Sequence, residues 1–442
     1  MLSFLSKNNI RSNFLNFLFI LIPGSYIAGN LILNLNILLI ILTGFFFYGK
    51  KIFQIKLYVL DKIIISFFIF VFFSGIINFI DLNYLKDENY ALAENFSFSV
   101  LIKSVSYIRY LILYFVLRYL IENELINFKF FFTSCLVFSL FVSLDIFYQF
   151  IFEKDIFGFE ATSARKFSGP FGNEFIAGGY LQRFAIFSFF LFSIFFKINK
   201  KLYLSLIIAI LFLIYLIALV LSGNRMPLIL FVFMTFLIFV FEKNIRKYLI
   251  FYLAITVIIC VALVNSNNLI KSNFSNFVTQ IQSISKIITT NEINQSGMNS
   301  YFHEFKTFYG TWLMNRYIGG GVKSFRINCW QRENINVGER TTCNTHPHNY
   351  YLEILADLGL VGFFILVVVF STILYISFFK KYFRSLSRPS DNILTPFMFL
   401  FFIEIFPIKS TGSFFTTSNA TFLFLVLAIT VALSRKLDLN RN

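Results

Sequence analysis

The chain has 442 residues, of which 57% are hydrophobic, 20% aromatic and 14% charged, and its mean hydropathy is +0.74. A soluble domain carries charge on about a quarter of its residues, and a disordered chain has low hydrophobicity, so this composition excludes both classes. The net charge of +16 could indicate a nucleic-acid partner. Whether it does depends on where the cations lie along the chain.

Long apolar runs predict an all-α polytopic membrane protein, because a hydrocarbon core about 30 Å thick takes roughly 20 apolar residues per helix. We predict about twelve transmembrane helices, at residues 14–29, 31–48, 62–80, 98–120, 128–152, 173–196, 202–221, 226–241, 248–264, 350–379, 392–408 and 417–434. The first two could form one re-entrant pair, since Pro23-Gly24 and Gly29-Asn30 interrupt the run. The first is not expected to be a cleaved signal peptide, because no small-residue cleavage pattern follows it.

Lys and Arg are distributed unevenly between the two sides of these spans. With the N-terminus inside, the inner segments hold 21 Lys and Arg against 6 Asp and Glu, whereas the four short outer loops hold 6 against 7. The positive-inside rule then predicts that both termini lie on the cytoplasmic side of the membrane. The inner segments carry a net +15, so the basic charge is a topology signal and no nucleic-acid partner is expected.

The spans divide the chain into nine N-terminal helices in residues 1–264, a long periplasmic loop at 265–349 and three C-terminal helices in 350–442. In the loop, apolar residues spaced 4, 3, 4, 3 and 4 apart predict one stripe along a helix, at Ile270, Phe274, Phe277, Ile281, Ile284 and Ile288. This amphipathic helix could pack on the rest of the loop or lie in the membrane interface.

A second helical run, from Phe302 to Trp312, ends at Gly319-Gly320-Gly321. No predicted strand precedes these glycines, so they indicate a flexible turn in an active-site loop and not a nucleotide-binding fold. The same loop holds Cys329 and Cys343. A disulfide between them is favoured over two free thiols, because a disulfide is permitted outside the cytoplasm.

The most polar stretch of the chain leads into the span at 350–379. It contains His346, Pro347, His348 and Asn349, with Glu353 and Asp357 four residues apart on one helix face. These residues could simply cap the helix. They could also supply a general base or hydrogen-bond donor at the membrane surface, since neutral imidazole suits that role near pH 7. A metal site formed with Cys343 is a third reading, although no tight ligand spacing is met.

Two short outer turns carry further cations. Arg225 stands beside Pro227 at the predicted start of a span, where free backbone N–H groups and a guanidinium could bind phosphate. Alternatively Arg225 marks the interface as a snorkelling side chain. Arg165 and Lys166 precede a Gly- and Pro-containing turn at residues 168–172.

Charged residues also fall within the predicted spans, where they usually face the bundle interior or a cavity. They are Lys103, Arg109, Asp145, Arg183 and Glu404. A buried pair of Asp145 with Arg109 or Arg183 is predicted, with either a structural or a functional role.

Four motifs follow one another in a familiar order. They are Ser168-Gly169-Pro170-Phe171-Gly172-Asn173, Ser222-Gly223-Asn224-Arg225, Gly319-x-Gly321-x-x-x-Phe325, and His348-Asn349-x-x-Leu352 with Gly359 and Gly362. Over about residues 165–365, and in the twelve-span layout, the chain resembles the O-antigen ligase and polymerase superfamily.

The resemblance implies a membrane glycosyltransferase that moves a glycan from undecaprenyl pyrophosphate to an acceptor hydroxyl on the periplasmic side. Ligases use a sugar of the lipid A core as acceptor, and polymerases use another lipid-linked repeat. His348 would assist the acceptor hydroxyl, and Arg225 and Arg165 would hold the pyrophosphate. No metal, nucleotide or other cofactor is expected, and membrane lipids complete the partners.

Asn349 and His346 would be further substrate contacts. The family often has an arginine near the start of the helix before the Gly-x-Gly turn, but residues 299–303 contain none. A third pyrophosphate contact would then fall to Arg316 or His303.

The ligase is the favoured reading and the polymerase is the alternative. A flippase or other transporter should show two related halves or broken midplane helices, and neither is evident in the sequence. A structural scaffold is disfavoured by the charged spans and the clustered outer cations.

Overall fold

A computed structural model describes residues 7–84, 91–161, 166–196, 201–242, 300–330, 343, 346–382, 393–410 and 412–439, with isolated positions between 258 and 282. These described residues are helical, apart from loops and one isolated bridge between Lys154 and Glu160. The predicted span at 248–264 and the amphipathic helix at 270–288 lie outside the described residues, apart from isolated positions.

The helices follow the predicted spans closely but are more often divided. They are α1 (Lys7–Ile20), α2 (Ile22–Ala28), α3 (Asn30–Phe53), α4 (Val59–Tyr84), α5 (Ala91–Tyr107), α6 (Arg109–Glu122), α7 (Phe128–Phe152), the short η1 (Gly169–Phe171), α8 (Ala177–Phe184), α9 (Ile186–Ile194), α10 (Lys201–Leu221), α11 (Arg225–Phe241), α14 (Ser300–Met314), α15 (Phe325–Asn328), α16 (Tyr350–Leu374), the π-helix η3 (Tyr375–Tyr382), α17 (Leu394–Glu404) and α18 (Thr417–Leu439).

Among the described residues, seven helical stretches are long and apolar enough to cross a membrane, and three shorter apolar helices accompany them. The all-helical membrane architecture is therefore confirmed in its class, whereas the count of twelve is not. The first predicted span is divided at Leu21, because Pro23 starts a separate helix, α2. The span predicted at 98–120 is interrupted between Tyr107 and Arg109, where α5 ends and α6 begins.

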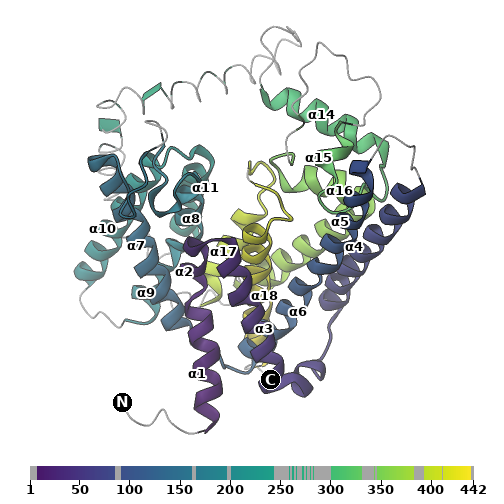
Figure 1. The fold of residues 1–442 in the computed structure, drawn as a ribbon. Helices are drawn as coiled ribbons and strands as arrows, with labels where there is room; N and C mark the ends of the chain where they lie inside the picture. The colour runs from purple at the N-terminus through teal and green to yellow at the C-terminus, as the bar shows by residue number, and fades with distance from the viewer. Residues whose placement is uncertain are drawn as a thin grey trace.

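Helix α18 lies at the centre of the bundle. Figure 1 shows α7–α11 on one side of α17 and α18, and α4–α6 with α14–α16 on the other. In the most apolar 18-residue stretch of α18, 89% of the residues are buried, whereas the corresponding share in α3 is 33%. Helix α3 therefore presents much of its apolar surface outward, as expected of a helix that faces lipid.

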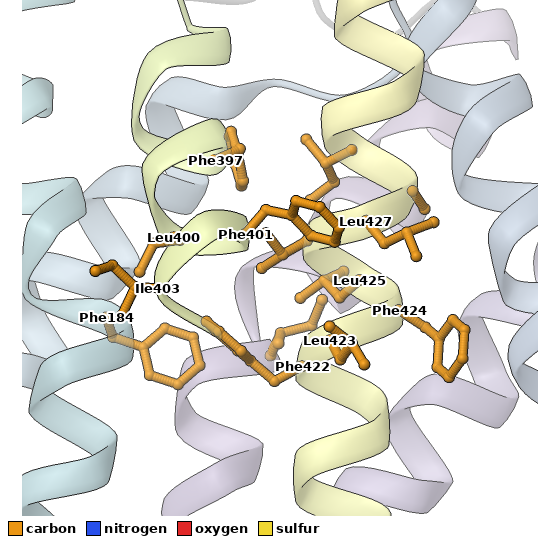
Figure 2. Close-up of a cluster of buried hydrophobic side chains, with 14 of the residues drawn as sticks. Phe184, Phe397, Leu400, Phe401, Ile403, Phe422, Leu423, Phe424, Leu425 and Leu427 are labelled. Atoms are coloured by element: carbon orange, nitrogen blue, oxygen red, sulfur yellow. The ribbon is translucent and has the colours of Figure 1, made fainter. Parts of the chain in front are cut away.

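Aromatic and aliphatic side chains of α17 and α18 fill this centre (Figure 2). The ring of Phe422 on α18 lies 5.5 Å from that of Phe184 on α8, and Phe424 stacks on Tyr110 of α6 at the same distance between centroids. Close packing of large rings fixes α18 against helices on both of its sides, α8 and α6.

The start of α1 and the end of α18 lie at the same end of the bundle. Ser12 and Asn16 of α1 both donate to the carbonyl of Leu125, at 3.0 and 2.8 Å. Lys436 of α18 pairs with Glu124 in the same turn, at 2.8 Å. The two helices therefore both contact the turn at residues 124–125, between α6 and α7.

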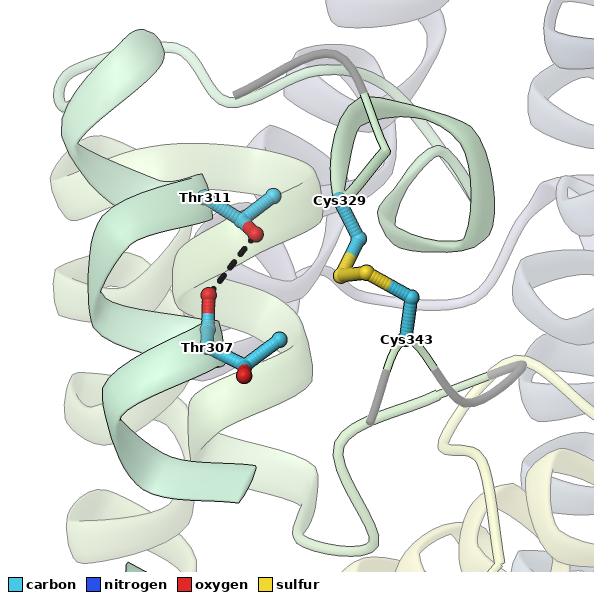
Figure 3. Close-up of a disulfide and its surroundings, with 4 residues drawn as sticks. All are labelled: Thr307, Thr311, Cys329 and Cys343. Atoms are coloured by element: carbon cyan, nitrogen blue, oxygen red, sulfur yellow. Dashed lines mark hydrogen bonds between the residues drawn. A yellow bond between two sulfur atoms is a disulfide. The ribbon is translucent and has the colours of Figure 1, made fainter. Parts of the chain in front are cut away.

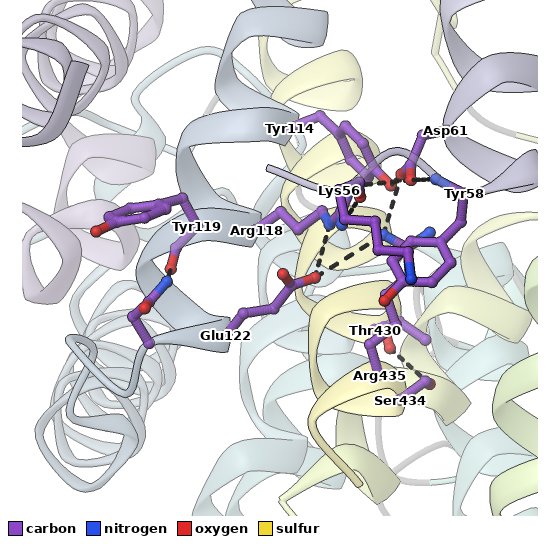
Figure 4. Close-up of polar contacts among 11 residues, drawn as sticks. Lys56, Tyr58, Asp61, Tyr114, Arg118, Tyr119, Glu122, Thr430, Ser434 and Arg435 are labelled. Atoms are coloured by element: carbon purple, nitrogen blue, oxygen red, sulfur yellow. Dashed lines mark hydrogen bonds and ion pairs between the residues drawn. The ribbon is translucent and has the colours of Figure 1, made fainter. Parts of the chain in front are cut away.

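A buried ion cluster lies at this end of the bundle (Figure 4). Arg118 on α6 pairs with Asp61 on α4 at 2.8 Å and with Glu122 at 2.6 Å. Arg435 of α18 also reaches Asp61, at 3.1 Å. The cluster ties α4, α6 and α18 together, because each buried charge has an opposite partner.

At the opposite end, a small second core holds the outer loop. A disulfide joins Cys329, which is buried, to Cys343, with Cα atoms 5.7 Å apart. Figure 3 shows it beside α14, in which Thr311 bonds the carbonyl of Thr307. Phe308 of α14 packs in the same cluster. The disulfide therefore fastens the chain before His346 onto the helices that cover α16.

Candidate functional site

The start of α16 is built by Asn349. Its side-chain oxygen accepts hydrogen bonds from the backbone N–H groups of Tyr351 and Leu352, at 3.0 and 3.2 Å. Its amide nitrogen donates to the carbonyls of Pro407 and Lys409, at 2.7 and 3.3 Å. Asn349 thus caps the helix, as one reading of the sequence predicted, and also holds the loop after α17 against it.

The two carboxylates on the predicted shared face of α16 each hold a loop. Glu353 accepts bonds from the hydroxyl of Ser413 and the N–H of Phe414. Asp357 accepts bonds from the N–H groups of Lys323 and Phe325, at 2.7 and 3.1 Å. Both carboxylates are buried, so they fasten the 413–414 and 323–325 segments to one helix.

Helix α16 is broken at Gly359, where φ is 64°. The Gly319 segment passes through the break: the N–H groups of Leu360 and Val361 donate to the carbonyls of Arg316 and Tyr317, at 2.8 and 3.1 Å. The span predicted at 350–379 therefore contains a break, because a glycine with positive φ lets another segment supply the missing acceptors. The glycine turn is held by hydrogen bonds and not left as a free loop.

A cavity of about 690 Å³ opens between α2, α8, α11, α18 and the loops beside them. Asn224 joins two of its walls: it accepts from the N–H of Gly178 at 3.1 Å and donates to the carbonyl of Phe175 at 3.0 Å. The lining combines apolar side chains such as Leu33 and Leu230 with the charged groups Arg183 and Lys409. Such a cavity fits an amphiphile with an anionic head.

Arg183 and Lys409 share one buried carboxylate. Glu404 lies 2.7 Å from the Arg183 guanidinium and 2.6 Å from the Lys409 ammonium. Arg183 also donates to Asn419 at 2.7 Å, and Tyr350 donates to Glu404 at 2.8 Å. Within this group two cations share one anion, which leaves a net charge of +1 held in fixed geometry by buried partners. Glu174 is a further charged residue of the cavity lining.

Burial lowers the pKa of Lys409 to about 8, even though Glu404 favours its charged form. Lys409 is therefore mostly charged at pH 7.

The predicted pair of Asp145 with Arg109 or Arg183 is wrong. Arg183 pairs with Glu404, whereas Asp145 accepts from the backbone N–H of Ile156 at 2.8 Å, and Arg109 donates to the hydroxyl of Tyr110 at 3.0 Å. All four of these charged residues had been placed within predicted spans, but the partner of Arg183 lies 221 positions away in sequence, and only folding selects it.

The two histidines of the predicted motif touch each other, with ring centroids 4.5 Å apart. His346 lines the cavity, and His348 is half-buried with φ of 34°. Burial, followed by the nearby His348, Lys323 and Arg326, lowers the pKa of His346 to about 4, so this ring is neutral at pH 7. A left-handed φ at a histidine is uncommon and recurs at functional sites.

The predicted arginines differ in their placement. Arg225 is the first residue of α11, and its neighbours Asn224, Met226 and Pro227 line the cavity. Arg316 is exposed on the turn after α14. Arg165 lies outside the described residues, as does the side chain of His303.

Lys409 and Asn419 are cavity residues that the sequence reading did not single out. Like Arg225, Lys409 is a lone cation in a short loop, here at 409–416, so the same sequence signal marks both residues. Asn419 carried no such signal, because a polar residue near a helix start is common.

The alternative metal site of His346, His348 and Cys343 is not formed, since the sulfur of Cys343 is bonded to Cys329. Within the described ranges no other group of three or more His, Cys, Asp or Glu side chains could hold a metal ion.

Residues 210–367 match the family model described as O-Antigen ligase. The resemblance to the O-antigen ligase superfamily is confirmed over this stretch. The matched segment runs from α10 to α16 and includes Arg225, the disulfide, both histidines of the motif and the break at Gly359. No curated protein matches the chain. The family and the apolar helices together indicate a multi-pass membrane enzyme of the O-antigen ligase and polymerase type.

Proposed function

We propose that this protein is a membrane glycosyltransferase of the O-antigen ligase type. It moves a glycan from undecaprenyl pyrophosphate to an acceptor hydroxyl, at the periplasmic face of the bacterial inner membrane. The observation that carries the proposal is the cavity in which Arg183 and Lys409 lie beside the family's histidine motif.

In this proposal the cavity cations stabilise the leaving group. As the bond between the anomeric carbon and the pyrophosphate oxygen breaks, negative charge grows on the pyrophosphate, and preorganised cations in a water-poor site stabilise it strongly. Arg183 and Lys409 are held in place by Glu404 before substrate arrives. Arg225, which directly follows a cavity-lining residue, is proposed to reach the same group from the start of α11.

His348 is proposed to take the proton of the acceptor hydroxyl as its oxygen attacks the anomeric carbon. A general base works best when its pKa lies near the working pH. His346, with a pKa of about 4, is a weak base at neutral pH. Its proposed role is to pack against His348 and fix the orientation of that ring at the edge of the cavity.

The break in α16 bears on the transporter alternative, because broken helices are typical of transporter binding sites. Here the N–H groups of Leu360 and Val361, which the break deprives of helical acceptors, donate to the carbonyls of Arg316 and Tyr317. The carbonyls of Ala356 and Asp357 likewise accept from the N–H groups of Gly320 and Gly321. These backbone groups at the break therefore hold a loop, which supports the enzyme.

The test is the lipopolysaccharide profile of a deletion strain on a gel, together with transfer by the purified protein from a lipid-linked glycan. Loss of every glycan chain attached to the core supports a ligase. Retention of single repeats on the core would show that the protein is a polymerase and not a ligase. A normal profile with no transfer in the purified system would contradict both.

A further inference from the structure

A second group of cations lies beside the histidine pair, outside the cavity. It consists of Lys103 on α5, Arg109 on α6, Lys323 in the glycine loop and Arg326 on α15. We call these four residues the second basic cluster. The proposed transfer mechanism gives none of them a task.

The fold brings the cluster together through Gly321. A Cβ atom on Gly321 would lie only 2.4 Å from a methyl carbon of Val100, so the loop backbone rests directly on α5. Asn78 of α4 secures the same loop by donating to the carbonyl of Gly319, at 3.1 Å. Lys103 follows Val100 by about one helical turn on the same face, and Lys323 follows Gly321 by two residues.

Carboxylates of the described residues offset the charge of the cluster only in part, since Glu353 and Asp357 act on Lys323 without forming an ion pair with it. None of the four forms an ion pair within the part of the chain that the structure describes. The carboxylate of Asp357 accepts hydrogen bonds from the backbone N–H groups of Lys323 and Phe325. The Nε of Arg326 is buried without a hydrogen-bond partner among the described residues. A buried donor without a partner is costly, and an anion would supply one.

The charged groups around Lys323 and His346 also indicate that the cations of the cluster lie close together. Burial lowers the pKa of Lys323, and the charges of Arg326 and Arg109 add to the effect while Glu353 and Asp357 oppose it. Lys323 and Arg326 also act on His346, which lines the cavity. The histidine pair therefore adjoins two basic sites built from different elements.

We propose that the second basic cluster binds an anionic group, most simply a phosphate, on the acceptor glycan. This inference rests on the proposed function. A base that activates the acceptor must lie within reach of both substrates. The cavity already supplies cations for the donor pyrophosphate, so the cluster on the other elements next to the histidines fits the acceptor. The headgroup of an anionic phospholipid has the same chemistry and is the competing source.

The experiment compares Lys323→Gln, Arg326→Gln and the double variant with the matched control Lys154→Gln, an exposed lysine in another loop. Full-length protein is placed in phosphatidylcholine nanodiscs. The first measurement is binding of a phosphorylated core oligosaccharide and of the same oligosaccharide after phosphatase treatment. The second is the KM for acceptor and for donor. We expect each variant to weaken phosphorylated acceptor by roughly ten- to a hundredfold, the cost of one charged hydrogen bond, and to leave the KM for donor unchanged.

The outcomes separate this inference from the proposed function. Unchanged binding and acceptor KM in the double variant, with transfer intact, would overturn the cluster's role and leave the transferase standing. If the variants lose acceptor binding but no form of the protein transfers glycan, the cluster is an anion-binding site and the proposed transferase function is wrong. Equal binding of phosphorylated and dephosphorylated acceptor by the native protein would overturn the inference. An effect seen only in phosphatidylglycerol nanodiscs would reassign the cluster to a lipid headgroup.

Discussion

Gly319 and Gly359 lie where two backbones cross at closest approach. A Cβ on Gly319 would lie 2.4 Å from the carbonyl carbon of Asp357, and a Cβ on Gly359 would lie 2.3 Å from that of Tyr317. Both glycines have positive φ. The two glycines therefore allow the outer loop to enter the break in α16, which positions Lys323 and the histidine motif around one helix.

We predict that Gly359→Ala destabilises the protein. The added methyl group would strain a left-handed backbone, at a cost of about 1–3 kcal/mol, and would also collide with the backbone of Tyr317. The measurement is the thermal unfolding midpoint in detergent. Gly49→Ala is the control, because a Cβ there meets only a ring carbon of Phe45 at 3.8 Å. Equal midpoints for the two variants would contradict the crossing.

Arg118→Gln should destabilise the bundle by about 3 kcal/mol or more, since removing one partner of a buried ion pair leaves the other charge uncompensated. Arg435 remains beside Asp61 and limits the loss. The control is Lys436→Gln, which removes a largely exposed pair at the same end of the bundle and should have little effect. Chemical denaturation followed by tryptophan fluorescence compares them. A smaller effect for Arg118→Gln than for the control would show that Asp61 and Glu122 hold the helices without it.

His348→Ala should lower transfer by roughly 10²–10⁴, the usual contribution of a general base, without changing protein level or unfolding midpoint. The assay is transfer from lipid-linked glycan by purified protein, alongside complementation of the deletion strain. Activity of the variant close to that of the native protein would leave His348 with only a structural place at the start of α16.

The proposed donor site should lose affinity as the pH rises through about 8, the pKa of Lys409. The charged ammonium binds the anion, so binding is complete below that pH and falls above it. Lys409→Arg should remove this alkaline limb, because guanidinium stays charged. The measurement is the pH dependence of the KM for donor. An alkaline limb that persists at the same pH in Lys409→Arg would assign it to another group.

Lys409 should affect stability in the opposite direction. Its folded pKa lies below the ordinary lysine value, so the unfolded chain binds more protons between the two values. The free energy of unfolding contributed by Lys409 therefore rises with pH above about 8 while donor binding falls. Unfolding midpoints of the native protein and Lys409→Arg across this range test the difference.

Thiol labelling of the denatured protein should modify two of the four cysteines before reduction and all four after it. Cys329 and Cys343 would be the pair protected by the disulfide. Reduction should also loosen the small core of Phe308, Phe325 and Ala356 and expose the loop to protease. Four reactive thiols before reduction would refute the bridge.

The sequence by itself determined the helical membrane class, the sidedness suggested by its cations and the stretch that carries the family motifs. Hydropathy and charge are properties of short segments, so they can be read from the sequence without knowledge of the fold. The helix start at Asn349 was equally readable, because a cap is a local hydrogen-bonding arrangement.

Only the tertiary structure decided which distant groups meet. It joined Arg183 to Glu404 and Lys409, placed His346 in a cavity wall and carried Gly319 into the break at Gly359. A buried charge must find an opposite charge, and a buried N–H must find an acceptor, but many candidates in the sequence satisfy either need. The packing of α8, α16, α17 and α18 selects among them, because it fixes which side chains come within hydrogen-bonding distance.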